Sequence, residues 1–476
     1  MADRHTTDIS EIIENQKLTP FVTRLILVST LVTFFDGFDM NVISLVAPEV
    51  SAALHLDKLM MGNVFSAGLA GTMAGGLLFG YLGDRIGRRP SIILATMSFG
   101  VLTLGLASAG SYQELVTLRF FQGIGIGGLL PLAWALNIDY VPRGYQSTVV
   151  TLLMLGYALG DSFAGPLSIW FTSYGWQSVF IFGGCAALAV TALLIFLLPE
   201  SIKFLTNKGK RPDLIARFAQ RLAPGRRIDA SDQFVVSDEL GRSGKGFRIS
   251  ALFRYELRWI TPLLWTAYIA GSIAIFLRVS WGPTILQAIG FSRPTAAYTT
   301  SISSLGGALG GLLLMRFTDT RGAISITVFP VLTVPLLLTM GLARIGGTPF
   351  LVMYFFLTML IVGTHFGLHS IAGVFYPSVF RSNGAGWAAS VAKIGSVMGP
   401  VIGGVVLSTP LPVRILFALF AVFPFVVGVG VFLLGLIQRR LWRRDTARQC
   451  AEVGRPGLSE DSQTTPLINR KTSLAN

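Results

Sequence analysis

The stretch GGLLFGYLGDRIG, residues 75–87, has a counterpart in the second half of the chain, GGLLLMRFTDTRG, residues 310–322. The two stretches align without a gap, and the alignment pairs Asp84 with Asp319. Each stretch carries the end of an apolar segment into a short loop that contains an acid, an arginine and a glycine. Agreement in position, charge and hydropathy predicts that the chain contains two copies of one structural unit.

The composition is that of a membrane protein. Of the 476 residues, 52% are hydrophobic and 13% are charged, whereas soluble globular domains contain roughly a quarter charged residues. These values exclude an ordinary soluble enzyme and also a disordered chain. The sequence contains no HExxH, GxSxG or Walker motif, so we expect neither an enzyme nor transport powered by nucleotide hydrolysis in this chain.

Apolar runs long enough to cross a bilayer occur twelve times, given that a spanning helix needs about 20 apolar residues. They lie at 22–46, 61–82, 91–109, 115–138, 147–171, 177–198, 259–282, 296–315, 323–342, 349–375, 385–408 and 413–437. We therefore expect an all-α membrane protein of twelve transmembrane helices in two pseudo-symmetric six-helix bundles.

These runs divide the chain into five regions. We expect an N-terminal segment, a first bundle, a polar linker with room for a short helix or two, a second bundle and a basic tail, at 1–21, 22–198, 199–258, 259–437 and 438–476.

The basic residues predict the orientation. Thirty-one of the 38 Lys and Arg residues lie on the side of the linker and the two termini, and four lie in the opposite loops. The positive-inside rule places the linker and both termini in the cytoplasm, with the chain in the plasma membrane. The tail sequence RRLWRR, residues 439–444, then indicates a contact with the lipid bilayer and not with nucleic acid.

The first apolar run contains two acids, in FFDGFDMNVISLVAPEV, residues 34–50. Asp36 and Asp39 are three residues apart, so both carboxyl groups lie on one helix face. Each would cost several kcal/mol if it faced lipid, so both must face a cavity or a partner. Burial favours the protonated form of a carboxyl group, as proton coupling requires. The alternative is a structural pair that neighbouring cations or backbone groups satisfy.

Several segments resemble a known family. The loop GYLGDRIGRRP, residues 80–90, resembles the signature loop of the major facilitator superfamily, and the resemblance covers nearly the whole chain. The DGFD pattern narrows it to the aromatic acid:proton symporter family. Three further segments resemble that family: RFFQGIGIGGLLPLAWALNIDYVP at 119–142, WGPTIL at 281–286 and FYPSVFRSNGAGWAASVAKIGSVMGPVIGG at 375–404.

The resemblance implies a function. A member of this family would import an aromatic carboxylic acid, hydroxybenzoate-like or larger and lignin-derived, for aromatic compound catabolism. It would do so by proton symport through alternating access, with H⁺ as coupling ion and no cofactor. We expect a monomer whose partners are the substrate, protons and lipid.

The signature loop is the candidate gate. Asp84 is suited to cap a neighbouring helix N-terminus, and Arg85, Arg88 and Arg89 are suited to pair with an acid such as Asp139. The resemblance implies that such pairs latch the outward-open state and break when the protein turns inward. Arg143 and Asp319 complete the candidate gating set. Plain topology would explain the arginines, but not Asp84 or the glycine spacing.

Charged residues inside the spans are the candidate substrate and proton sites. The resemblance ties Arg119 to substrate and proton coupling, and its guanidinium is able to bind a carboxylate bidentately. Lys393 stands where the family usually has arginine, so the positive charge remains but the bidentate geometry of a guanidinium is lost. Asp161 stands where a small residue is expected, and is either a further proton site or a partner for a cation such as Lys393. Arg278 is either a ligand or a snorkelling side chain.

The tenth run contains His365 and His369, which share a helix face. The pair is suited to bind a phenol or a second carboxylate, or to share protons, and simple packing is the alternative. Trp281 and Phe38 adjoin these candidates and are suited to stack on a substrate ring. The number of cations suggests a substrate bulkier than simple benzoates, or one with a second anionic group.

Two rival functions remain open. One is a carrier for another organic anion, or an exporter, because GSVMGPVIGG at 395–404 is similar to an exporter motif. That motif belongs in the fifth span, however, where only AGP remains. The other is a sensor on a transporter scaffold, which would bind its ligand without flux and carry a large cytoplasmic domain.

Overall fold

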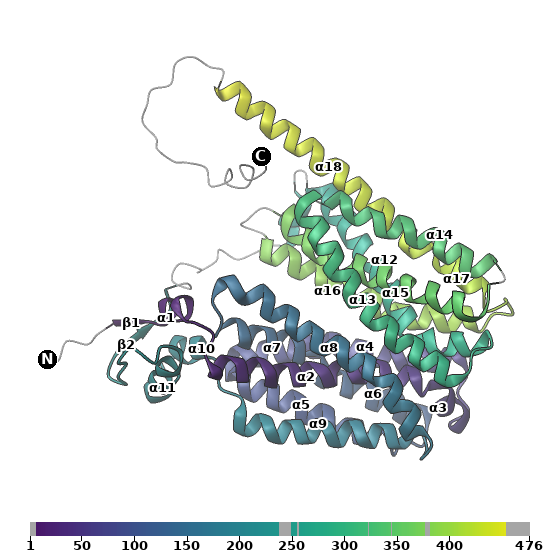
Figure 1. The fold of residues 1–476 in the computed structure, drawn as a ribbon, viewed down its shortest axis with the longest axis horizontal. Coiled ribbons are helices and arrows are strands. Elements are labelled where there is room, and N and C mark those ends of the chain that lie inside the picture. The colour runs from purple at the N-terminus through teal and green to yellow at the C-terminus, as the bar shows by residue number, and fades with distance from the viewer. Residues whose placement is uncertain are drawn as a thin grey trace.

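The computed structural model describes residues 6–237, 249–254, 257–321, 323–343, 345–376 and 381–453. Its helices form two bundles that lie side by side along their length (Figure 1). The first bundle consists of α2 (Pro20–Leu45), α4 (Lys58–Ile86), α5 (Arg88–Leu106), α6 (Tyr112–Gly127) with α7 (Leu129–Ile138), α8 (Arg143–Thr172) and α9 (Gln177–Leu197). The second consists of α12 (Leu257–Ala288), α13 (Arg293–Arg321), the 3₁₀ turn η3 (Ala323–Thr327) with α14 (Val328–Leu342), α15 (Gly347–Phe375), α16 (Arg381–Leu407) and α17 (Ile415–Phe420) with α18 (Val422–Val453).

Each predicted span coincides with one helix or with two consecutive helices, which confirms the all-α membrane fold. In the part of the chain that the structure describes, 11 helical segments are long and apolar enough to cross a membrane. The predicted span at 296–315 lies in α13, which is rich in Thr, Ser and Gly and packs against α8 and α15. Its small polar residues lower its hydropathy, but its 29-residue length still exceeds the span of a bilayer.

Glycines allow the helices of the first bundle to approach one another closely. A Cβ atom at Gly71 of α4 would collide with the backbone oxygen of Phe120 in α6, and one at Gly123 would collide with that of Gly68. The glycines of the GIGIGG segment therefore have a packing role. This crossing of α4 and α6 fixes the position of the residues that α6 turns toward the centre of the bundle.

The N-terminal segment and the linker fold together into a small unit. β1 (Thr6–Asp8) pairs in parallel with β2 (Gln233–Val235), and the unit also contains α1 (Ile9–Asn15), α10 (Ile202–Asn207) and α11 (Pro212–Leu222). Phe218 of α11 stacks on Phe21, with 5.9 Å between the ring centroids. The short linker helices agree with the sequence analysis, but strands of three residues are too short for a detectable alternating pattern. We call the end of the molecule that carries this unit the linker end.

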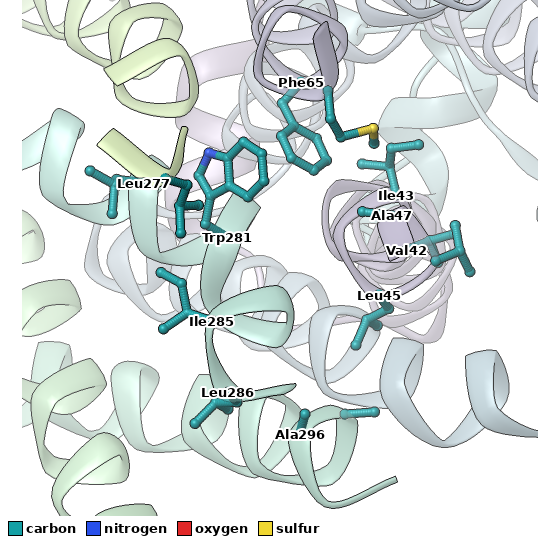
Figure 2. Packing of buried hydrophobic residues seen from close by; sticks show 14 of the residues in the cluster. Val42, Ile43, Leu45, Ala47, Phe65, Leu277, Trp281, Ile285, Leu286 and Ala296 are labelled. Atoms are coloured by element: carbon teal, nitrogen blue, oxygen red, sulfur yellow. The ribbon is translucent and has the colours of Figure 1, made fainter. Parts of the chain in front are cut away.

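The opposite end, which we call the far end, is sealed by one hydrophobic cluster shared by both bundles. Val42 of α2 and Phe65 of α4 belong to it together with Trp281 and Ile285 of α12 (Figure 2). The Trp281 ring meets the Phe65 ring edge-on at 5.3 Å, and its Nε1 donates to the carbonyl oxygen of Pro400 at 2.9 Å.

Polar contacts between the bundles reinforce the seal. Arg293 Nη1 lies 3.0 Å from Glu49 Oε1, and Lys58 Nζ donates to the carbonyl oxygen of Leu407 at 3.0 Å. Toward the linker end, by contrast, each bundle has a hydrophobic cluster of its own. The bundles are thus packed together at the far end and separate toward the linker end.

Replacing Trp281 tests the seal. Trp281→Ala should lower stability by about 3–5 kcal/mol, because it removes a large, fully buried ring from the cluster, and should lower the midpoint of thermal unfolding of the purified protein. Trp259→Ala is the matched control, since 63% of Trp259 is exposed. Equal midpoints for the two variants would contradict the assignment of Trp281 to the seal.

Candidate functional site

Three of the predicted charged residues are buried at the centre of the first bundle. Asp36 and Asp39 of α2 are 3% and 2% exposed, and Arg119 of α6 is 4% exposed. Arg119 does not snorkel to the surface, because its neighbours are Asp39 and the backbone around Gly68.

Asp39, Arg119 and Gln122 form one hydrogen-bonded network. Arg119 Nη1 lies 3.3 Å from Asp39 Oδ2 and donates to Gln122 Oε1 at 2.5 Å. Gln122 Nε2 donates to Asp39 Oδ1 at 2.9 Å and to the hydroxyl oxygen of Thr103 at 2.6 Å. Both carboxylate oxygens are therefore bonded, and the two charges neutralise each other while both side chains are almost fully buried. Removing one partner of such a pair leaves an uncompensated buried charge, at a cost of about 3–5 kcal/mol.

The network lies at the wall of a pocket between the bundles. Arg119 and Gln122 line this pocket together with residues of α2 and α4 from the first bundle and Phe276 and Ser280 from α12 of the second. A ligand that enters between the bundles therefore meets the edge of the Asp39–Arg119 pair.

Lys393 of α16 extends into the space between the bundles. It interacts electrostatically with Asp36 of the first bundle and with His365 and His369 of the second. Its side chain is exposed, so this lysine is both central and accessible. The structure thus places Lys393 beside Asp36 and not, as one alternative had it, opposite Asp161.

Asp161 of α8 instead faces Arg278 of α12. Ser304 hydrogen-bonds to the Asp161 carboxylate and the charge of Arg278 acts on it. Arg278 is 9% exposed and lines an apolar pocket with Tyr354. Arg278 therefore lies in the interior, and its charge is opposed by an acid from the other bundle.

Tyr157 is a central residue that the sequence analysis missed. Its phenol lies within electrostatic range of Asp36, Asp39, Asp161 and Arg278. Gln122 was missed as well. Both had a signal in the sequence: Tyr157 precedes Asp161 by four residues and Gln122 follows Arg119 by three, so each shares a helix face with a recognised charge.

The two histidines of α15 lie beside Lys393 and are linked to Tyr268 of α12. His369 Nε2 is 3.2 Å from His365 Nε2, and His369 Nδ1 is 3.4 Å from the Tyr268 hydroxyl. That hydroxyl donates to the carbonyl oxygen of Leu368 at 2.9 Å.

The two candidate stacking residues belong to the far-end cluster. Phe38 is 2% exposed and meets the rings of Phe35 and Phe182. Trp281 is enclosed in the seal described above. The structure therefore gives both residues a packing role and does not bring them to the accessible side of the cavity.

The candidate gating residues lie at the linker end. Arg88 forms an ion pair with Asp139, and Asp139 also accepts a hydrogen bond from the Ser201 hydroxyl. Arg85 donates to the Tyr81 hydroxyl at 2.7 Å, and the backbone N–H of Arg143 donates to Glu14 at 3.2 Å. The side chain of Asp319 lies outside the described residues.

Two observations bear on the expected gate. Asp84 is exposed, and Glu200 caps a helix at this end, where it accepts from the backbone N–H groups of Arg88 at 2.9 Å and Arg89 at 3.2 Å. The predicted Arg88–Asp139 pair is formed, and both of its residues belong to the first bundle.

Glu200 is a residue of the linker end that the sequence analysis missed. Burial raises the pKa of its carboxyl group, and the N–H donors of Ser201, Arg89 and Arg88 oppose that effect. The Tyr140 hydroxyl donates to the backbone oxygen of Glu200 at 2.5 Å. Glu200 thus ties the start of α5 to the end of the first bundle and to the linker.

Comparison with known proteins agrees with this architecture. The family model described as Major Facilitator Superfamily matches residues 29–379. The chain is 30% identical to a gallate transporter of Pseudomonas putida, an alignment that covers 90% of this chain and 95% of that protein. It is 29% identical to a 4-hydroxybenzoate transporter of Acinetobacter baylyi, covering 91% and 95%, and 26% identical to a benzoate transport protein of the same organism, covering 98% and 99%.

Solved structures share the fold. The xylose transporter of Escherichia coli in a partially occluded inward-open conformation superposes with a TM-score of 0.68 at 17% identity, covering 86% of this chain and 98% of that one. A bacterial homologue of the human lysosomal transporter Spinster, in an inward-facing and occupied conformation, superposes with a TM-score of 0.64 at 17% identity, covering 88% and 97%.

The curated relatives confirm the resemblance to the aromatic acid:proton symporter family that the motifs indicate. With two six-helix bundles around a central charged site, the chain belongs to the Major Facilitator Superfamily and is a membrane transport protein, not an enzyme.

Proposed function

We propose that the protein imports an aromatic carboxylic acid together with protons, by alternating access through the space between its bundles. The observation that carries this proposal is the buried Asp39–Arg119 pair at the wall of the interbundle pocket. The relatives named for gallate, 4-hydroxybenzoate and benzoate transport support the substrate class.

Coupling follows from the charge balance of this pair. Protonation of Asp39 removes the negative charge that neutralises Arg119, and the buried guanidinium then needs another anion. The substrate carboxylate is that anion. Proton binding and substrate binding therefore strengthen each other, and by thermodynamic linkage the effect is reciprocal.

Lys393 is the cation at the centre of the molecule that an incoming carboxylate reaches most easily. It is exposed, whereas Arg119 and Arg278 are buried and each is opposed by an acid. This balance removes the apparent excess of cations on which the hypothesis of a bulkier or dianionic substrate rested. It favours a substrate with one carboxylate.

The orientation follows from the distribution of basic residues, which places the linker end and both termini in the cytoplasm of a cell whose plasma membrane holds the protein. The structure then corresponds to an inward-open state. Entry of a lone anion against the membrane potential would cost about 2.3 kcal/mol per 100 mV, and co-transported protons offset that cost. No cofactor is needed, and one chain contains both halves of the site, so we propose that a monomer suffices.

The first test is transport in proteoliposomes that contain the wild-type protein or Asp39→Asn. Wild-type vesicles should accumulate labelled hydroxybenzoates only with an inward proton gradient. The variant should lose that accumulation but retain exchange of internal for external acid, because asparagine resembles protonated Asp39 and leaves Arg119 able to bind the carboxylate. Uptake is measured by filtration with a panel of aromatic acids.

The matched control is Asp57→Asn, because Asp57 caps α4 far from the pocket and asparagine preserves a cap. Gradient-driven accumulation by Asp39→Asn would contradict the coupling role. Saturable binding without flux in the wild-type protein would indicate a sensor, and uptake restricted to non-aromatic anions would overturn the substrate class.

The second test concerns Lys393. Lys393→Gln should weaken binding of the acid by about tenfold or more, because the accessible positive charge is lost, while Lys393→Arg should retain most of the affinity. Equilibrium binding to purified protein measures both. Lys17→Gln removes an exposed lysine outside the site and serves as control. An equal loss in the Arg and Gln variants would show that charge is not what Lys393 contributes.

A further inference from the structure

The hydrogen bonds among Tyr268, His369 and His365 determine which atom of each group carries a proton. A hydroxyl has one hydrogen, and that of Tyr268 is donated to the carbonyl oxygen of Leu368 at 2.9 Å. In its 3.4 Å contact with His369 Nδ1, the Tyr268 oxygen must therefore accept. His369 consequently carries its proton on Nδ1.

The same argument extends to the next ring. A neutral His369 with its proton on Nδ1 has a bare Nε2, which is an acceptor. The 3.2 Å contact between the two Nε2 atoms then requires that His365 Nε2–H donate to His369. His365 Nδ1 is left as an acceptor at the end of the chain.

This terminal acceptor has no partner among the described residues. His365 Nδ1 is buried and makes no hydrogen bond to any of the described residues. A proton on it would place a second cation beside Lys393, whose charge acts on both rings, and would leave a buried N–H without an acceptor. The ring is therefore neutral, and its Nδ1 is a buried acceptor that native proteins normally satisfy.

On the basis of the proposed function, we propose that His365, held by His369 and Tyr268, is the subsite that recognises a hydroxyl group on the substrate ring. Together with Arg119, Lys393 binds the carboxylate at one end of the acid, and His365 Nδ1 accepts a hydrogen bond from the ring hydroxyl at the other. Because Nδ1 is enclosed in the inward-open state, the contact forms when the bundles close around the substrate. Because His365 Nδ1 is a hydrogen-bond acceptor, this subsite excludes a second carboxylate, which has no proton to donate.

A purely structural role for the two histidines would explain fewer of these observations. Packing would account for two adjacent imidazoles, but not for a directed chain that ends in an unsatisfied acceptor beside an exposed lysine. A buried acceptor left unpaired also penalises any ligand that lacks the matching donor, and this is how a site discriminates hydroxylated from plain substrates.

The test compares ligands that differ only at the ring substituent. Equilibrium binding of benzoate, its 3- and 4-hydroxy derivatives and the corresponding methoxy derivatives is measured with the purified full-length wild-type protein. At least one hydroxy acid should bind about tenfold more tightly than benzoate, and its methoxy counterpart should lose that advantage because an ether cannot donate. A methoxy acid that binds as tightly as its hydroxy counterpart overturns the proposal without any variant.

Variants of His365 test whether this residue causes the preference for hydroxylated acids. His365→Leu should erase the hydroxyl advantage, because it removes the acceptor, whereas His365→Asn, which keeps a carbonyl acceptor, should retain part of it. His55→Asn is the matched control, because His55 lies in the turn between α3 (Ala47–Ala53) and α4 with a φ of 54°, which asparagine tolerates.

The outcomes separate the two proposals. Equal losses for benzoate and the hydroxy acids in both His365 variants would show a structural role, and an unchanged hydroxyl advantage would exclude His365 as the recognition residue. Either result overturns this inference and leaves aromatic acid transport intact. A wild-type protein that binds none of these acids would overturn the proposed function and this inference with it.

Discussion

A positive charge buried inside a membrane bundle must have an anion beside it, and this constraint organises the centre of the molecule. Arg119 meets it with Asp39, and Gln122 holds both partners through hydrogen bonds of 2.5 and 2.9 Å. The glycines that bring α4 and α6 into contact give the guanidinium its place, because larger residues would collide with the facing backbone. The packing of α4 against α6 thus positions Arg119 for its ion pair with Asp39 of α2.

The need for a neighbouring anion also explains how the other two central cations differ. Arg278 is opposed by Asp161 from the other bundle, while Lys393 is accessible and lies near buried Asp36. A cation that water reaches tolerates the loss of its partner better than a dry one, because solvent screens it. An incoming carboxylate therefore displaces water at Lys393 at low cost, but reaches a buried guanidinium only after an acid there has been neutralised. This order of events is what the proposed symport requires.

Much of this arrangement could be predicted from the sequence, since twelve apolar runs and their intervening charges dictate the spans, and intramembrane charges identify the interior faces. Apart from Arg88 with Asp139, the partners of charged residues across helices could not be predicted. The pairing of Lys393 with Asp36 depends on how α16 faces α2, which no periodicity in either helix encodes. Glu200 looked like an ordinary linker acid, and its role as a cap for α5 depends on a tertiary contact across more than a hundred residues. The β1–β2 pairing escaped prediction for the same reason, because three-residue strands derive their stability from the partner.

The distribution of ion pairs between and within bundles has a consequence for alternating access. Asp39–Arg119 and Arg88–Asp139 each lie within the first bundle, so a rocking motion of rigid bundles leaves their distances unchanged. The Glu49–Arg293 pair joins the two bundles, and the electrostatic interactions of Asp36 with Lys393 and of Asp161 with Arg278 also act between them, so the same motion must alter them. The pairs within a bundle are therefore suited to keep their charge state during the motion, whereas the interactions between bundles set the relative stability of the two open states. In the proposed cycle, the proton that neutralises Asp39 acts on the conformational equilibrium through the substrate carboxylate that Arg119 then binds.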